Sequence, residues 1–155
     1  MYSNDEKIDQ VKMILKEVFE NDSEDLEMID TLSDSQFFYV LVYEGIDNCP
    51  IATGILIADE NKAKVKSIAV RKDYRRKQYG DMVVRMLVEK AKSLSFTDIE
   101  VKVPIYLATM FEAIGFLSID DLKFNNEIKP LNSFVRMKYN NNYTRKCKNI
   151  DNNVD

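Results

Sequence analysis

The sequence contains no histidine and no tryptophan, and its 155 residues include only two cysteines, four glycines and three prolines. Without an imidazole, a Ser-His-Asp triad, a Cys-His pair, a zinc-protease helix and every histidine-ligated metal centre are excluded. Two cysteines cannot supply the four ligands of a structural zinc site. We therefore expect a protein with no metal centre, whose chemistry uses no histidine.

Long apolar segments are also missing. The chain begins with the polar residues MYSNDEKIDQ, which do not form a signal peptide. No apolar run reaches the roughly 20 residues that a membrane-spanning helix needs. Cys49 and Cys147 lie far apart in the sequence. We therefore predict a cytoplasmic protein with no membrane partner and with both thiols reduced.

Neither charge nor composition is extreme. The 22 basic and 26 acidic residues give a formal net charge of −4, which argues against a nucleic-acid partner because such binding depends on neutralising phosphates. With 45% hydrophobic residues, the chain is long enough for one globular domain. We place this domain at residues 1–139 and expect a disordered polar tail over residues 140–155. We expect a monomer or a homodimer.

Hydrophobic periodicity predicts a helix, three strands, a helix, a strand, a helix and two strands. We expect the helices at residues 5–20, 81–94 and 105–114, and the strands at 36–44, 51–58, 63–70, 98–104, 116–124 and 133–139. Short links between the first three strands indicate an antiparallel meander. This order is typical of an α+β fold, a mixed α/β arrangement with one sheet layer and helices packed on it.

Several smaller features follow from the same patterns. A short additional helix is expected at residues 25–28, and Gly115 stands where a helix C-cap is expected. Met82, Met86 and Met110 have helical spacing, which predicts that they belong to the core.

The junction between the third strand and the following helix carries the clearest chemical signal. Five positive charges fall within seven residues of an acidic chain, just before Gly80: Arg71, Lys72, Arg75, Arg76 and Lys77. A helix start offers unpaired backbone N–H groups and a partial positive charge, which suit a phosphate. The alternative of a solvated basic turn stays open. Walker and dinucleotide fingerprints are excluded because their Gly-Lys-Ser/Thr ending or spaced glycines are absent.

The run SIAVRKDYRRKQYGDMVVRMLVEKA resembles the acyl-CoA-binding motif of the GCN5-related N-acetyltransferase (GNAT) family. That motif reads R/Q-x-x-G-x-G/A between a strand and a long helix, and Arg75 and Gly80 match its first and last positions. The later run YLATMFEAIGF is similar to the second signature of the family, and the order of elements over residues 36–139 also fits.

The resemblance implies a single GNAT-like domain with a mixed, mostly antiparallel central sheet that is splayed in the middle and flanked by helices. It also implies acetyl-CoA as co-substrate and direct attack by a primary amine of a small molecule or peptide. The splay would separate residues 64–70 from 98–104, and the pantetheine arm would pair with the strand end as an added strand. The implied CoA-binding residues are Ile68, Ala69, Val70, Arg75, Arg76, Lys77, Gln78, Tyr79, Gly80 and Asp81.

The sequence departs from the family pattern at four positions. Gln78 replaces the first motif glycine, so its Cβ would crowd the pyrophosphate or require another loop path. Asp81 favours the helix dipole but would repel a diphosphate. Phe111 stands where many members carry a tyrosine that protonates the CoA thiolate, and Lys64 stands where some carry a catalytic glutamate.

No catalytic acid or base is therefore identified. Tyr106 and Glu100 are the candidate substitutes, although each is better explained as a surface residue. The alternative function is a catalytically degenerate member that binds acyl-CoA as a sensor or interaction module.

The missing base bears on the acceptor. Deprotonating a lysine side chain at pH 7 costs about 4.6 kcal/mol, whereas an α-amine costs only about 1–1.4 kcal/mol. A site without an imidazole or an evident carboxylate base therefore favours an acceptor whose amine has a low pKa, such as an α-amine or an amino sugar.

Overall fold

The computed structural model describes residues 4–19, 37–46, 48–119 and 133–142. The elements follow the predicted order: α1 Asn4–Phe19, β1 Phe37–Tyr43, β2 Pro50–Asp59, β3 Lys62–Val70, α3 Tyr79–Ser93, β4 Asp98–Pro104, α4 Ala108–Ile114, β5 Phe116–Ser118 and β6 Phe134–Tyr139. Two 3-10 turns, η1 Lys72–Tyr74 and η2 Ile105–Leu107, precede α3 and α4. The short helix expected at residues 25–28 lies outside the described residues.

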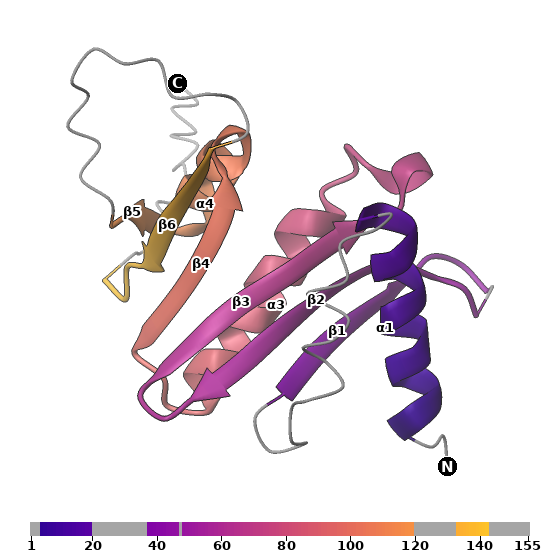
Figure 1. The fold of residues 1–155 in the computed structure, drawn as a ribbon, viewed down its shortest axis with the longest axis horizontal. Helices are drawn as coiled ribbons and strands as arrows, with labels where there is room; N and C mark the ends of the chain where they lie inside the picture. Colours follow the sequence, from indigo (N-terminus) through magenta and orange to yellow (C-terminus); the bar gives the residue numbers. More distant parts are fainter. Residues whose placement is uncertain (1–3, 20–36, 47, 120–132, 143–155) are drawn as a thin grey trace, which may run out of the picture.

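Six strands form one sheet in the order β1-β2-β3-β4-β6-β5 (Figure 1). The predicted meander is confirmed, because β1, β2 and β3 pair antiparallel in succession. The β3–β4 pair is parallel, and β6 pairs antiparallel with both β4 and β5. The sheet is therefore mixed and mostly antiparallel, as the sequence indicated.

The sheet opens between β3 and β4. Their parallel pairing extends only from Lys62 opposite Asp98 to Val65 opposite Val101, although β3 continues to Val70 and β4 to Pro104. Figure 1 shows the two strands diverging beyond this point. The expected splay is present, but it begins after Val65, because Lys64 and Val65 still pair with β4.

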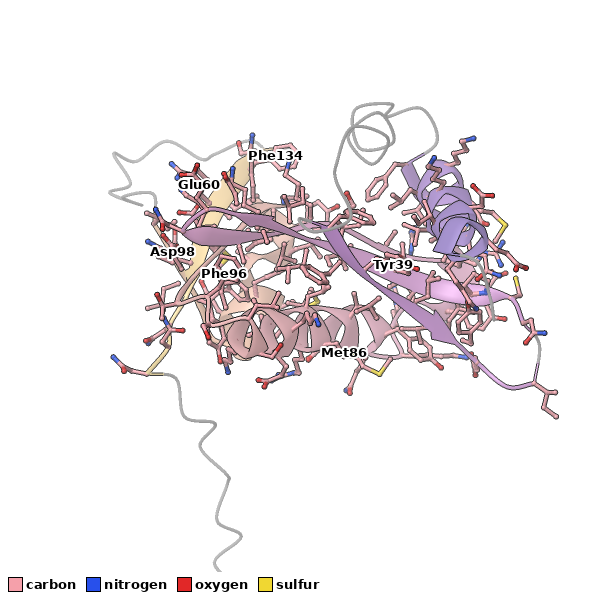
Figure 2. All side chains as sticks on the ribbon, turned by 90° about the horizontal axis from the view of Figure 1, so that it is seen from below. Tyr39, Glu60, Met86, Phe96, Asp98 and Phe134 are labelled. Carbon is pink, nitrogen blue, oxygen red and sulfur yellow. The ribbon has the colours of Figure 1, made fainter. Side chains whose placement is uncertain are left out.

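Helices cover both faces of the sheet, and Figure 2 shows α1 and α3 on opposite sides. Residues of α3 and α4 share a hydrophobic core with one face of the sheet, whereas Val11, Ile14 and Leu15 of α1 pack with Ile55 and Ala69 on the other. None of the described helices is long and apolar enough to cross a membrane.

Two of the three methionines expected in the core lie at the surface. Met82 and Met86 are 39% and 49% exposed, and Figure 2 shows Met86 on the side of α3 away from the sheet. The contact with the sheet is filled by the stripe Val83, Val84, Leu87, Val88 and Ala91. That stripe occupies the full apolar arc of the helix, so it leaves Met82 and Met86 outside. Met110 packs half-buried against the core.

Gly115 ends α4 as expected. Its φ of 124° is a backbone conformation open to glycine, and its N–H donates to the carbonyls of Phe111 and Glu112. Its carbonyl accepts from the N–H of Asn140, which ties the start of the predicted tail to the domain. The strand expected at residues 116–124 is shorter, because β5 ends at Ser118. Residues 143–155 lie outside the described residues.

Candidate functional site

The segment between β3 and α3 carries the basic cluster. Arg71 lies at its start, where its N–H donates to the Ile51 carbonyl at 2.9 Å. Its guanidinium donates to the carboxylate of Glu17 in α1, at 2.6 and 2.8 Å, and to the sulfur of Cys49 at 2.8 Å. The hydrogen bond to Glu17 raises the pKa of Arg71. Arg71 therefore fastens α1 to the loop and is not available to a ligand.

The other four basic side chains of the cluster differ in their contacts. Arg75 Nε donates to the Val70 carbonyl at 3.1 Å. The Lys77 ammonium lies 3.9 Å from the Glu44 carboxylate and 5.4 Å from the Tyr74 ring centroid. For Lys72 and Arg76, the described part of the chain offers no hydrogen-bond or ion-pair partner. Two cations of the predicted cluster are thus free to meet an anion.

The start of α3 is an uncapped helix end. Its N-cap residue is Gln78, whose side chain makes no capping hydrogen bond, and the first helical bond runs from the Met82 N–H to the Gln78 carbonyl. Among the residues that the structure describes, none accepts a hydrogen bond from the N–H groups of residues 76–81. Helix starts with unpaired donors favour bound phosphates, and α3, with 15 residues, begins with such donors.

Gln78 occupies the first glycine position of the motif in a glycine-like conformation. Its φ and ψ are 65° and 16°, in the left-handed region, and Arg76 also has a positive φ of 64°. The loop therefore keeps the path that a glycine would permit, at a conformational cost to both side chains. Both outcomes expected from the sequence, a crowded pyrophosphate and another loop path, stay predictions.

Gly80 is not required by the protein's own packing. A Cβ placed on it would meet only the Cγ2 of Val70, at 3.8 Å, which is ordinary contact, and its φ is not in the left-handed region. A glycine here thus leaves open space beside the free N–H groups of the helix start. That space is what a closely approaching ligand needs.

The charge of Asp81 is compensated within α3. Its carboxylate accepts from Arg85 Nε one helical turn later. This contact reduces the repulsion that Asp81 would exert on a diphosphate. Tyr79 packs half-buried against the core, where desolvation and the nearby Glu44 carboxylate raise the pKa of its phenol. Its hydroxyl therefore stays protonated.

The last residues of β3 border the splay, as predicted. Ala69 and Val70 pair with Thr53 and Ala52 of β2, and beyond Val65 no residue of β3 pairs with β4. The edge of Ile68, Ala69 and Val70 that faces β4 is therefore available to a strand-like ligand. The pairing with β2 shifts between Thr53 and Ile55, where Ser67 has a positive φ of 54°.

Ser67 lies beside the splay at a position that the sequence did not single out. Its hydroxyl oxygen is buried and has no hydrogen-bond partner within the described residues. A serine in the middle of a strand gives no sequence signal, because only the irregular pairing with β2 makes its position special.

Three different elements carry the residues considered for proton transfer: α4 carries Phe111, η2 carries Tyr106 and β4 carries Glu100. Phe111 is 1% exposed and packs edge-on against Phe116, so it belongs to the core. Tyr106, in η2, is 67% exposed. Glu100 lies in β4 with its carboxylate 3.6 Å from the Lys62 ammonium and its backbone opposite Lys64. Within the described residues, no hydrogen bond joins Tyr106 to Glu100.

A family model identifies the family of this chain. Residues 7–116 match the family model described as the acetyltransferase (GNAT) family. The chain belongs to the GNAT acetyltransferase family. No curated protein matches the chain closely enough to be called a relative.

Solved structures share the GNAT fold at low sequence identity. A Bacillus subtilis acetyltransferase in complex with CoA is 19% identical, with a TM-score of 0.63, covering 90% of this chain and 94% of its own. The ribosomal-protein-S18-alanine N-acetyltransferase from Escherichia coli is 12% identical, with a TM-score of 0.69 over 93% and 97% of the two chains. An IAA acetyltransferase from Bacillus cereus is 15% identical, with a TM-score of 0.63 over 83% and 90%.

Membership of the GNAT family makes acyl transfer the general class of this protein's activity. The uncapped helix start and the open edge of β3 both lie in the run that resembles the acyl-CoA-binding motif of the family.

Proposed function

We propose that this protein is an N-acetyltransferase that transfers the acetyl group of acetyl-CoA to a primary amine of a small molecule or peptide by direct attack. The observation that carries the proposal is the set of unpaired N–H groups at residues 76–81. They lie beside the open edge of β3 in a chain of the GNAT family. The CoA complex of the Bacillus subtilis protein of the same fold supports CoA as the carrier.

In the proposed complex, the backbone N–H groups of residues 76–81 bind the pyrophosphate, and the free cations Lys72 and Arg76 add to their attraction. Arg75, Lys77, Gln78, Tyr79, Gly80 and Asp81 shape this loop and helix start. The pantetheine arm pairs with the edge of Ile68, Ala69 and Val70. A backbone N–H of β3 donates to the thioester carbonyl and stabilises the charge that develops there.

The acceptor amine must lose a proton before it attacks, so the ease of its deprotonation determines which amine is preferred. Phe111 carries no proton, and Glu100 is engaged by Lys62, so we assign no general base to the site. An α-amine or amino sugar needs less help with deprotonation than a lysine side chain. Among amines tested with acetyl-CoA at pH 7, α-amines should react faster, and faster acetylation of lysine side chains would contradict this preference.

The second candidate function is acyl-CoA binding without turnover. The core position of Phe111 and the strained Gln78 favour it. Calorimetric titration with acetyl-CoA, followed by detection of released thiol over an amine library, distinguishes the two. Binding with thiol release supports the transferase, binding without release from any amine supports the sensor, and no binding contradicts both.

A further inference from the structure

The face of the sheet opposite α3 carries a row of charged side chains on β3, β4 and β6. In each strand, apolar residues that pack toward α3 and α4 alternate with charged ones. Because successive side chains of a strand point to opposite faces, the charged set lies on the side away from α3. Figure 2 shows Phe134 of β6 on that side. The set is Lys62, Lys64, Lys66, Asp98, Glu100, Lys102, Arg136 and Lys138.

The charges on this face are unevenly placed along the strands. At the closed end of the β3–β4 pair, Lys62 is 3.6 Å from Glu100 and Lys138 is 3.2 Å from Asp98, so both acids are compensated. The backbone of Lys64 lies opposite Glu100, but its ammonium has no hydrogen-bond or ion-pair partner among the described residues. At this end Lys64 therefore carries one positive charge beyond those that the two acids compensate.

The end where the splay opens is cationic. Lys66 and Lys102 are the first residues after the last paired position, Val65 opposite Val101, and Arg136 lies opposite Lys102 on β6. We call Lys66, Lys102 and Arg136 the cationic row. The described parts of the three strands contribute no acid to this row. Lys102 lies 5.4 Å from the centroid of the exposed Phe134 ring.

Like charges at neighbouring positions of a sheet are unfavourable unless an anion is bound there. Lys66 and Arg136 make further contacts in the protein, so the charge that matters for a ligand is the excess carried by Lys64 and Lys102. This excess borders the splay in a chain whose net charge is −4. An attacking amine that entered the splay from this face would pass beside both side chains.

We propose that the acceptor carries carboxylate groups close to its reacting amine, and that Lys64 and Lys102 bind them. This inference rests on the proposed acetyl transfer. The carboxylates of an acidic acceptor attract it to the face and orient its amine toward the splay. The two sources of this chemistry are a free acidic amino acid and a peptide with acidic residues after its N-terminus.

The test compares kcat/KM, with saturating acetyl-CoA, for peptides that begin Ala-Asp-Glu and Ala-Asn-Gln, and for aspartate and asparagine. We expect at least about a tenfold preference for the acidic member of one pair, which also identifies the source. In Lys64→Gln/Lys102→Gln this preference should fall to about threefold or less, because kcat/KM for the acidic acceptor falls. The control Lys16→Gln/Lys90→Gln, an equal loss of two charges at exposed residues of α1 and α3, should retain it.

A measurement of peptide binding distinguishes a failure of this inference from a failure of the proposed acetyl transfer. A fluorescent acetylated acidic peptide should bind the wild-type protein with CoA and lose affinity in the double variant, whether or not turnover occurs. Such binding without any turnover overturns the acetyl transfer and retains the acidic-ligand surface. Equal rates for both members of each pair, or a preference that survives in Lys64→Gln/Lys102→Gln, overturns the inference even in an active enzyme.

Discussion

Arg85 compensates Asp81 at the entrance to the anion site. Its Nε donates to both carboxylate oxygens of Asp81, at 2.7 and 2.8 Å, across one turn of α3. Asp81 thus contributes to the favourable charge of the helix start without presenting an unpaired charge to the proposed diphosphate.

Removing Arg85 should therefore weaken CoA binding without removing any proposed ligand contact. We expect Arg85→Gln to raise the Kd for CoA by about threefold, because Asp81 then faces the diphosphate unpaired. In the double variant Asp81→Asn/Arg85→Gln most of the affinity should return. Calorimetric Kd values for the four proteins of this cycle measure the coupling, and additive effects of the two changes would contradict it.

Replacing Gln78 by glycine should relieve the strained loop. The left-handed conformation of Gln78 is open to glycine without steric cost, so we expect Gln78→Gly to raise the free energy of unfolding by about 0.5–1 kcal/mol. The affinity for CoA should be equal or higher. Urea unfolding checks the stability.

Lys77→Gly in the same loop is the control for Gln78→Gly. Lys77 has no positive φ, so its change to glycine adds flexibility, removes the side-chain contacts with Glu44 and Tyr74, and should lower the stability. If both variants lose stability equally, the strain assigned to Gln78 is wrong.

Substitutions at Gly80 and Gly54 distinguish a glycine that a ligand requires from a glycine that the packing of the protein requires. Gly80→Ala should leave the unfolding free energy nearly unchanged, because its Cβ meets only Val70 at 3.8 Å. The Kd for CoA should rise about tenfold, since the Cβ occupies the space of the ligand. Unchanged CoA affinity in this variant would contradict the position of the pyrophosphate.

Gly54→Ala is the matched opposite case. Its Cβ would lie 2.5 Å from Val83 Cγ1 and 2.6 Å from Ile68 Cδ1, where α3 crosses β2. We expect a loss of about 1–3 kcal/mol in the free energy of unfolding from overpacking. Thermal unfolding of the two glycine variants side by side would show this contrast.

The proton-transfer question can be tested at Glu100. A general base contributes about 10²–10⁴-fold to the rate, whereas Glu100 is engaged by Lys62. We therefore expect Glu100→Gln to change kcat by less than about threefold, similar to Lys62→Gln. A hundredfold loss of kcat in Glu100→Gln alone would identify Glu100 as the base. Tyr106→Phe provides the same measurement for the exposed phenol.

The basic loop and the order of elements were predictable from the sequence, because charge clustering and hydrophobic period are local properties. The same local patterns could not decide which face of a helix is covered. Met82 and Met86 have core spacing, yet the stripe from Val83 to Ala91 already fills the contact with the sheet. The first point of the splay also escaped prediction, because strand pairing depends on residues far apart in the sequence.

The amino-acid sequence by itself determined the element order, the helix start at a phosphate-sized site and the absence of imidazole chemistry. These features depend on residue types and their spacing along the chain. Only the tertiary structure decided that Arg71 forms an ion pair with Glu17 and that Gln78 adopts a glycine-like conformation. It also placed Lys64 and Lys102 beside the opening of the sheet. Each of these depends on strand register or on contacts between distant segments, which form only when the chain packs.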